Sequence, residues 1–226
     1  MPMRRPPPDR IRRLALGCLA SLAMVGAGVA HARDPRIALL EAIRLDDDAT
    51  VRRLLAQSVS PNLREKTHGP AIVMAAKLDS FRSLAELANA PDIDLEASDP
   101  DGQTALMMAA IKGHAPSVKL LLERGARVDS DGWTALHYAA SGGHTEVARI
   151  LILRGANLDA RSANGTTPVM LAARNEHFST MELLADMGAD LAARNESGRG
   201  VIEYLEARKE HARIPDIRER ISRRRR

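Results

Sequence analysis

Aromatic side chains are nearly absent from this chain of 226 residues. Two phenylalanines, two tyrosines and one tryptophan make up 2% of the sequence, whereas hydrophobic residues as a whole make up 45%. A single core of this size would normally contain more large rings. Thin helical layers stacked side by side are instead filled well by Ala, Leu, Val and Met. The composition therefore favours a layered helical protein.

Cysteine is represented by one residue, Cys18, which excludes an intramolecular disulfide and a metal site built from several cysteines. It lies in a leader, residues 1–32, in which five arginines precede an uncharged apolar run over 14–30. The leader closes with the small residues Ala30 and Ala32 flanking one position, the pattern behind which signal peptidases cut. We therefore predict a cleaved secretory signal peptide over 1–32 and a periplasmic or secreted mature chain of a bacterium.

Two other interpretations of the leader stay open. An uncleaved membrane anchor is disfavoured because the apolar run contains glycines and is shorter than the roughly 20 residues that a span needs. A lipoprotein signal attached at Cys18 is disfavoured by Ala15, three residues before it, and by the apolar stretch that follows. Removal of the leader would leave no thiol, 28 basic residues and 28 acidic residues. The basic character of the whole chain would then belong largely to the leader.

A unit of about 33 residues recurs along the rest of the chain. Its most constant feature is a pair of small residues at the end of an apolar run, as in Leu136-His137-Tyr138-Ala139-Ala140. The anchor residue of the unit falls at positions 42, 75, 109, 139, 172 and 205, with spacings of 33, 34, 30, 33 and 33. A period this regular indicates a solenoid of stacked repeats.

Each unit has the pattern of two short helices separated by a polar break. In the clearest unit, residues 134–141 form a predicted first helix and Gly143 belongs to the break. A second helix is expected from His144, and Gly155 should end it because glycine best tolerates the left-handed conformation that closes a helix.

These units resemble ankyrin repeats, whose consensus is a DxxGxTPLHxAA string followed by a GHxxVxxLLLxxGA string. The matching residues of the clearest unit are Gly132, Thr134, Leu136, His137, Ala139, Ala140, Gly143, His144, Leu151, Gly155 and Ala156, with Ala135 in place of proline. The resemblance implies an all-α solenoid of about six helix-turn-helix units, four clear and two capping. We expect a repeat domain over 33–216, with units of about 34–65, 66–98, 99–128, 129–161, 162–194 and 195–216, and a basic C-terminal helix end or tail over 217–226.

The departures from the repeat are informative as well. The turn before Trp133 is three residues short, since residues 128–132 replace a longer turn such as 158–165. We predict a stunted turn at this place. The first unit has Asp46 where a glycine break is expected, which is typical of a terminal unit that meets water on one side.

Three histidines, His114, His144 and His177, recur at spacings of 30 and 33, and histidine is a common metal ligand. Their shared repeat position favours a structural role instead, because neighbouring repeats stand on the order of 10 Å apart and a zinc ligand bonds near 2 Å. Thr134 and His137 are likewise interpreted as a local hydrogen-bonded pair. With no catalytic grouping and no phosphate-binding loop, we expect no enzyme activity, no cofactor, no metal site and no small-molecule substrate.

The surface is therefore the candidate functional feature. The resemblance implies that the concave face, built from turn tips and exposed positions of first helices, binds one protein partner. Carried over by position, the predicted partner-binding residues are Asp101, Gln103, Ile111, Lys112, Trp133, Ser141, Asn164, Thr166, Arg174, Asn175 and Arg199. Trp133 is either a binding anchor or a cover for the stunted turn. The protein is expected to be a monomer. Resemblance to bacterial exported ankyrin-repeat proteins implies a role in catalase-associated peroxide defence or, alternatively, a toxin-neutralising immunity role.

The C-terminal segment is strongly basic. Residues 208–226 hold nine basic and three acidic side chains, whereas residues 33–207 hold 19 basic and 25 acidic ones. Pro215 predicts the start of a second helix there. A peripheral membrane contact through the arginines from Arg218 to Arg226 gives an alternative role, an envelope-associated structural protein. Nucleic acid is not expected as a partner, because the segment lacks interleaved aromatics and the chain is expected to be exported.

Overall fold

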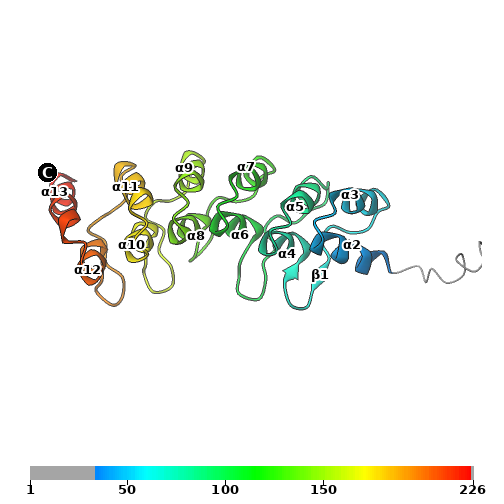
Figure 1. The fold of residues 1–226 in the computed structure, drawn as a ribbon, viewed down its shortest axis with the longest axis horizontal. Coiled ribbons are helices and arrows are strands. Elements are labelled where there is room, and N and C mark those ends of the chain that lie inside the picture. Colours follow the sequence, from blue (N-terminus) through cyan, green and yellow to red (C-terminus); the bar gives the residue numbers. More distant parts are fainter. Residues whose placement is uncertain (1–33, 225–226) are drawn as a thin grey trace, which may run out of the picture.

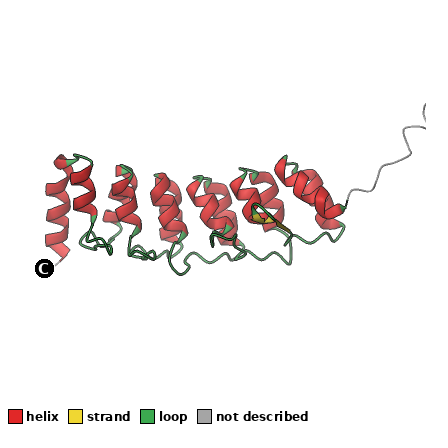
Figure 2. Ribbon diagram, turned by 90° about the horizontal axis from the view of Figure 1, so that it is seen from below, coloured by secondary structure: helices red, strands yellow, loops and turns green. Residues whose placement is uncertain are grey.

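The computed structural model describes residues 34–224, so the predicted signal peptide, with Ala30 and Ala32 at its end, lies outside the described residues. Twelve α-helices form six pairs that stack in two rows (Figure 1), and long loops run along one edge of the stack (Figure 2). The pairs are α2 (Pro35–Arg44) with α3 (Asp48–Ala56), α4 (Ala71–Lys77) with α5 (Phe81–Ala88), α6 (Ala105–Ile111) with α7 (Ala115–Glu123), α8 (Ala135–Gly142) with α9 (Thr145–Leu153), α10 (Pro168–Arg174) with α11 (Phe178–Asp186), and α12 (Val201–Ala207) with α13 (Ile214–Arg224). A short 3-10 helix, η1 (His211–Arg213), precedes α13, and β1 (Arg64–Glu65) pairs with β2 (Gly69–Pro70) in an antiparallel hairpin. The predicted all-α solenoid is confirmed.

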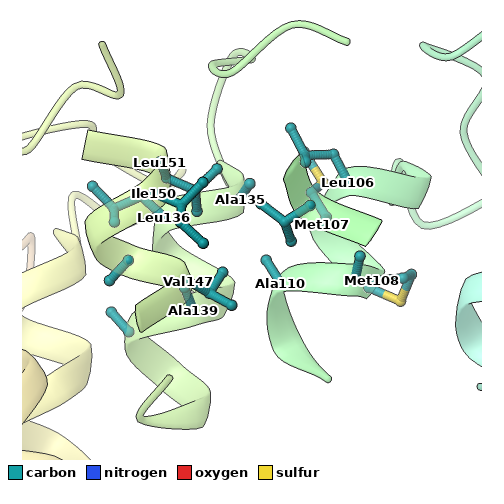
Figure 3. Packing of buried hydrophobic residues seen from close by; sticks show 14 of the residues in the cluster. Leu106, Met107, Met108, Ala110, Ala135, Leu136, Ala139, Val147, Ile150 and Leu151 are labelled. Carbon is teal, nitrogen blue, oxygen red and sulfur yellow. The ribbon is translucent and has the colours of Figure 1, made fainter. Parts of the chain in front are cut away.

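The central first helices are buried almost along their whole length. Each lies between the first helices of the neighbouring repeats. Side chains of α6 and α8 meet between these two helices (Figure 3). Ala109 and Ala110 of α6 and Ala139 and Ala140 of α8 are completely inaccessible to solvent. Small side chains at these positions let the helix backbones approach, and Leu106 and Leu136 fill the remaining space. The scarcity of aromatic residues is therefore a consequence of thin layers.

A histidine at the start of a second helix can tie its repeat to the preceding one. His144 donates from Nε2 to the carbonyl of Ile111 at 2.8 Å, and His177 donates in the same way to Ser141 at 3.0 Å. His114 differs, because its ring stacks on Phe81 with 3.7 Å between centroids and its Nδ1 bonds Ser117. The structural interpretation of the three histidines is confirmed, with two arrangements instead of one.

In two repeats, the residue between the two helices has a left-handed backbone conformation and packs against the histidine of the following repeat. A Cβ atom on Gly113 would lie 2.4 Å from the ring of His144, and one on Gly143 would lie 2.5 Å from the ring of His177. Glycine is needed at both places. Where no such ring approaches, the chain accepts a side chain in the left-handed conformation, as at Asp46, with φ of 51°. The aspartate predicted to replace a glycine therefore adopts the conformation of the glycine.

The turn before α8 is shorter than its neighbours, as predicted, and projects less far than the turns before α6 and α10 (Figure 1). In the turn before α6, Ser98 and Thr104 form a backbone bridge, and Ser162 N–H donates to the Thr166 carbonyl before α10. Before α8 the closing bond is made by a side chain instead, from Ser130 Oγ to the Trp133 carbonyl at 2.9 Å.

The final unit is a complete helix pair. The boundary that the sequence analysis draws between 216 and 217 falls inside α13, because Ile217 is buried at 2% exposure and fixes this helix against the rest of the repeat. The arginines of α13 face carboxylates: Arg218 lies 3.8 Å from Glu206, Arg220 lies 2.5 Å from Asp186 and 2.8 Å from Asp216, and Arg223 lies 2.6 Å from Glu219. Much of the basic charge of this segment is therefore neutralised locally.

Candidate functional site

The predicted partner-binding residues come from the turns and from the ends of first helices, which share one side of the solenoid (Figure 1). Five of them are exposed: Asp101, Lys112, Trp133, Asn164 and Arg199. Another five are partly buried: Gln103, Ile111, Ser141, Arg174 and Asn175. Repetition of the unit thus brings ten positions onto the predicted concave face.

Thr166 does not belong to this surface, so its prediction as a binding residue is wrong. Its side chain is 2% exposed. Its backbone N–H donates to Ser162 Oγ at 3.1 Å, and its carbonyl accepts a bond from His137 of the preceding repeat at 3.0 Å. These bonds hold Thr166 at the base of the turn before α10.

Side chains at the ends of first helices are held by adjacent repeats. Lys112 Nζ lies 2.9 Å from Asp79 of the preceding repeat. Asn175 donates from Nδ2 to the carbonyl and the hydroxyl of Ser141, at 2.9 and 3.1 Å. Because their conformations are restrained before any partner arrives, less conformational entropy is lost when a partner binds them.

Trp133 lies at the end of the short turn and is 38% exposed. Its ring is tilted against two rings of α8, with centroids 5.4 Å from His137 and 5.7 Å from Tyr138. We call Trp133 and Tyr138 the aromatic pair. Tyr138 is only partly buried, and it is not among the predicted binding residues. The signal was present, because the equivalent positions in the neighbouring repeats hold the apolar residues Met108 and Leu171.

His137 forms a buried hub beneath Trp133. Its Nδ1 accepts from the Thr134 N–H at 3.1 Å and lies 2.9 Å from Thr134 Oγ1, and its Nε2 lies 3.0 Å from the Thr166 carbonyl. Since a carbonyl only accepts, Nε2 carries the proton and the ring is neutral. Burial lowers the pKa of His137 below its ordinary value of 6.5. The predicted local pair of Thr134 and His137 is confirmed, and it also extends to the next repeat.

Thr167 precedes α10 as Thr134 precedes α8, but Met170 replaces the histidine. The Thr167 side chain is 1% exposed, and its hydroxyl has no hydrogen-bond partner among residues 34–224. Replacing Thr167 with valine should therefore raise the free energy of unfolding by about 1 kcal/mol, since it removes a buried polar group and keeps the shape. Thr134→Val is the matched control and should lower it by about 1 kcal/mol. Urea denaturation measures both; a loss of stability in Thr167→Val would contradict this account.

The electrostatic surroundings of the aromatic pair are acidic. Asp99 is buried and forms an ion pair with Lys77, while Asp101 and Asp131 are exposed and make no ion pair with any described residue. The pKa of Tyr138 is raised above its ordinary value of 10, first by burial and further by the carboxylates of Asp99 and Asp101. Two carboxylates are thus close enough to act on the Tyr138 hydroxyl.

No other feature of residues 34–224 competes with this surface as a chemical site. No group of three or more His, Cys, Asp or Glu side chains there is arranged to hold a metal ion. Two large cavities lie elsewhere: one of 840 Å³ is lined by residues after α11 and by α13, and one of 610 Å³ is lined by the ends of α3 and α5 with the loops that follow. None of the predicted binding residues lines either cavity. None of the described helices has the length and apolar character needed to cross a membrane.

Comparison with known proteins supports the repeat. A family model described as ankyrin repeats (3 copies) matches residues 39–131 and 125–195. The mouse protein "Ankyrin repeat and SAM domain-containing protein 6" is 36% identical over 141 residues, which are 62% of this chain and 13% of that protein. The mouse "B-cell lymphoma 3 protein homolog" is 30% identical over 161 residues, 70% of this chain and 30% of that protein. The human "Photoreceptor ankyrin repeat protein" is 36% identical over 80 residues, 34% of this chain and 18% of that protein. The chain thus spans less than a third of the length of these curated relatives.

Proposed function

Because the chain belongs to the ankyrin-repeat family, we propose that it is a non-catalytic module that binds one protein partner on its concave face. The observation that carries the proposal is Trp133, a large ring left 38% exposed but fixed against His137 and Tyr138. Tryptophan and tyrosine are enriched among the residues that contribute most of the binding energy at protein interfaces. The restrained side chains of Lys112 and Asn175 extend the same surface over neighbouring repeats.

We further propose that the partner is met outside the cytoplasm, since the leader over 1–32 has the pattern of a secretory signal peptide. The partner would then be a component of peroxide defence or a toxin, the two roles that the resemblance to exported proteins implies. An envelope contact through the arginines from Arg218 to Arg226 is the weaker proposal. Arg218, Arg220 and Arg223 already lie beside carboxylates of the same chain, which leaves less charge for a membrane.

The double variant Trp133→Ala with Lys112→Glu tests the concave face. We expect it to reduce capture of the partner at least tenfold, because it removes the exposed ring and reverses an exposed charge, while the helical circular-dichroism signal stays unchanged. The partner is first identified by affinity capture of the exported protein and mass spectrometry, and its binding to each purified variant is then measured by calorimetry.

A matched control places the same kinds of change on the outer row of helices. Leu153 of α9 is 72% exposed and Lys119 of α7 is exposed, so Leu153→Ala with Lys119→Glu again removes one large apolar side chain and reverses one charge. This control should bind the partner as the unaltered protein does. Full binding by the Trp133 and Lys112 double variant would remove the concave face from the proposal.

A further inference from the structure

We propose that the aromatic pair, Trp133 and Tyr138, receives a cationic side chain, arginine or lysine, from an extended segment of the protein partner. This inference rests on the proposed function and adds the chemistry of the group that is recognised. It draws on the geometry of the rings, the short turn that uncovers them, and the unpaired carboxylates nearby.

The two rings form an open corner. Their centroids are 5.7 Å apart and their planes meet at 51°, so the faces are not stacked on each other. Ammonium and guanidinium groups bind over the faces of tryptophan and tyrosine within about 6 Å of the ring centroid. The same contact already occurs inside this chain, where the Arg213 guanidinium lies 3.9 Å from the centre of the Phe178 ring. No described cation of the chain occupies the faces of Trp133 in this way.

The short turn explains why the corner is accessible. The neighbouring turns before α6 and α10 are longer and are closed by backbone bonds. Residues 128–132 lack three residues of that length, and their tip at Asp131 makes no bond to either neighbouring turn in the described structure. A chain that crosses the row of turns can therefore approach Trp133 at this repeat.

The unpaired charges near the corner are negative. Asp131 is two residues before Trp133, and Asp101 acts on the pKa of the Tyr138 hydroxyl, yet neither carboxylate has a cationic partner among the described residues. The nearby lysines are already engaged, Lys77 with Asp99 and Lys112 with Asp79. An incoming cation would find the exposed part of the Trp133 ring and free carboxylates, and the excess of acidic residues over 33–207 adds long-range attraction.

Fluorescence titration tests the proposal directly, because Trp133 is the single tryptophan of the chain and reports only on this site. The probe is a blocked seven-residue peptide of alternating glycine and arginine, and its control has citrulline, a neutral analogue of the same shape, in place of arginine. The arginine peptide should change the Trp133 emission saturably and bind at least about fivefold more tightly than the citrulline peptide. Added salt should weaken it.

Asp101→Asn and Asp131→Asn should each weaken the arginine peptide about two- to fivefold, which is the effect of one exposed charge pair. Asp92→Asn is the matched control, since Asp92 is exposed and lines the 610 Å³ cavity beside α3 and α5, away from the aromatic pair, and it should bind the peptide as the unaltered protein does. Equal binding of the citrulline peptide, tighter binding of a glutamate peptide, or no difference between Asp101→Asn and Asp92→Asn would overturn the proposal.

Binding of the partner on the concave face and recognition of a cationic side chain by the aromatic pair are two hypotheses that the experiments can reject independently. If the Trp133 and Lys112 double variant loses the physiological partner while the arginine peptide shows no preference over citrulline, the concave face stands and the cationic specificity is rejected. If the double variant keeps the partner while the arginine peptide binds selectively, the corner is a cation site that the partner does not use, and the inference about the partner is rejected.

Discussion

Replacing His137 with alanine is expected to lower the free energy of unfolding by about 3 kcal/mol. The imidazole is fully buried and bonds the Thr134 N–H on one side and the Thr166 carbonyl of the next repeat on the other. Alanine would leave both backbone groups buried without partners and would open a cavity beneath Trp133. Urea denaturation followed by circular dichroism measures the change.

Two comparisons make the His137 test specific. His177→Ala, which removes one carbonyl bond of a partly buried ring, should lower the free energy of unfolding by about 1 kcal/mol.

The second comparison is the dependence of the stability of His137→Ala on pH. Because the pKa of His137 is lowered in the folded state, the unfolded chain binds the proton more readily, so its contribution is present above about 6.5 and is lost as the pH falls through the folded pKa. Protonated Nδ1 would also face the Thr134 N–H, donor against donor. The difference in free energy of unfolding between the unaltered protein and His137→Ala should therefore become smaller below pH 6.5. A destabilisation of His137→Ala by less than 1 kcal/mol at pH 7.5 would contradict the structural role of His137.

Gly143→Ala should destabilise the protein by about 3 kcal/mol. Gly143 has a φ of 73°, where a side chain costs about 1 to 2 kcal/mol, and a Cβ atom would also lie 2.5 Å from the ring of His177. The ring would have to leave its place against the Ser141 carbonyl, which breaks the bond between repeats. The free energy of unfolding from urea titration is again the measurement.

Gly155→Ala is the matched control for the steric part. Gly155 is also left-handed, with φ of 89°, but nothing lies within 4 Å of a Cβ atom there, so only the backbone cost of about 1 kcal/mol is expected. In a His177→Ala background, Gly143→Ala should cost no more than Gly155→Ala, because the obstructing ring is gone. Equal losses for Gly143→Ala and Gly155→Ala in the unaltered background would show that the ring moves aside freely.

The period of the sequence was sufficient to predict the helices. The predicted first helix over 134–141 and second helix from His144 differ from α8 and α9 by about one residue at each end, because the same small anchors and terminal glycines recur in each copy. The local pair of Thr134 and His137 was also predictable, since three residues separate them at the start of a helix. Patterns that act within one repeat are therefore readable from one sequence.

Features that arise between repeats were harder to predict. The carbonyl of the buried residue Thr166 accepts a bond from His137, 29 residues earlier, and the ion pairs of Arg220 and Arg213 join residues 34 and 31 positions apart. Sequence spacing places such residues near each other but does not say which side chain covers which. Tyr138 is a different case, because its difference from Met108 and Leu171 at the same repeat position is visible in the sequence.

The contacts between neighbouring repeats also determine how the solenoid can unfold. Each helix contacts only its own repeat and the repeats next to it, and α13 rests mainly on α12 and η1. Unfolding of the last repeat would therefore break one interface between repeats and leave the other layers intact. Local unfolding can thus begin at an end of the solenoid and proceed one repeat at a time. The layer that carries Trp133 is the fourth of six, so at least two layers separate it from either end, and the exposed ring stays in place while an end repeat opens and closes.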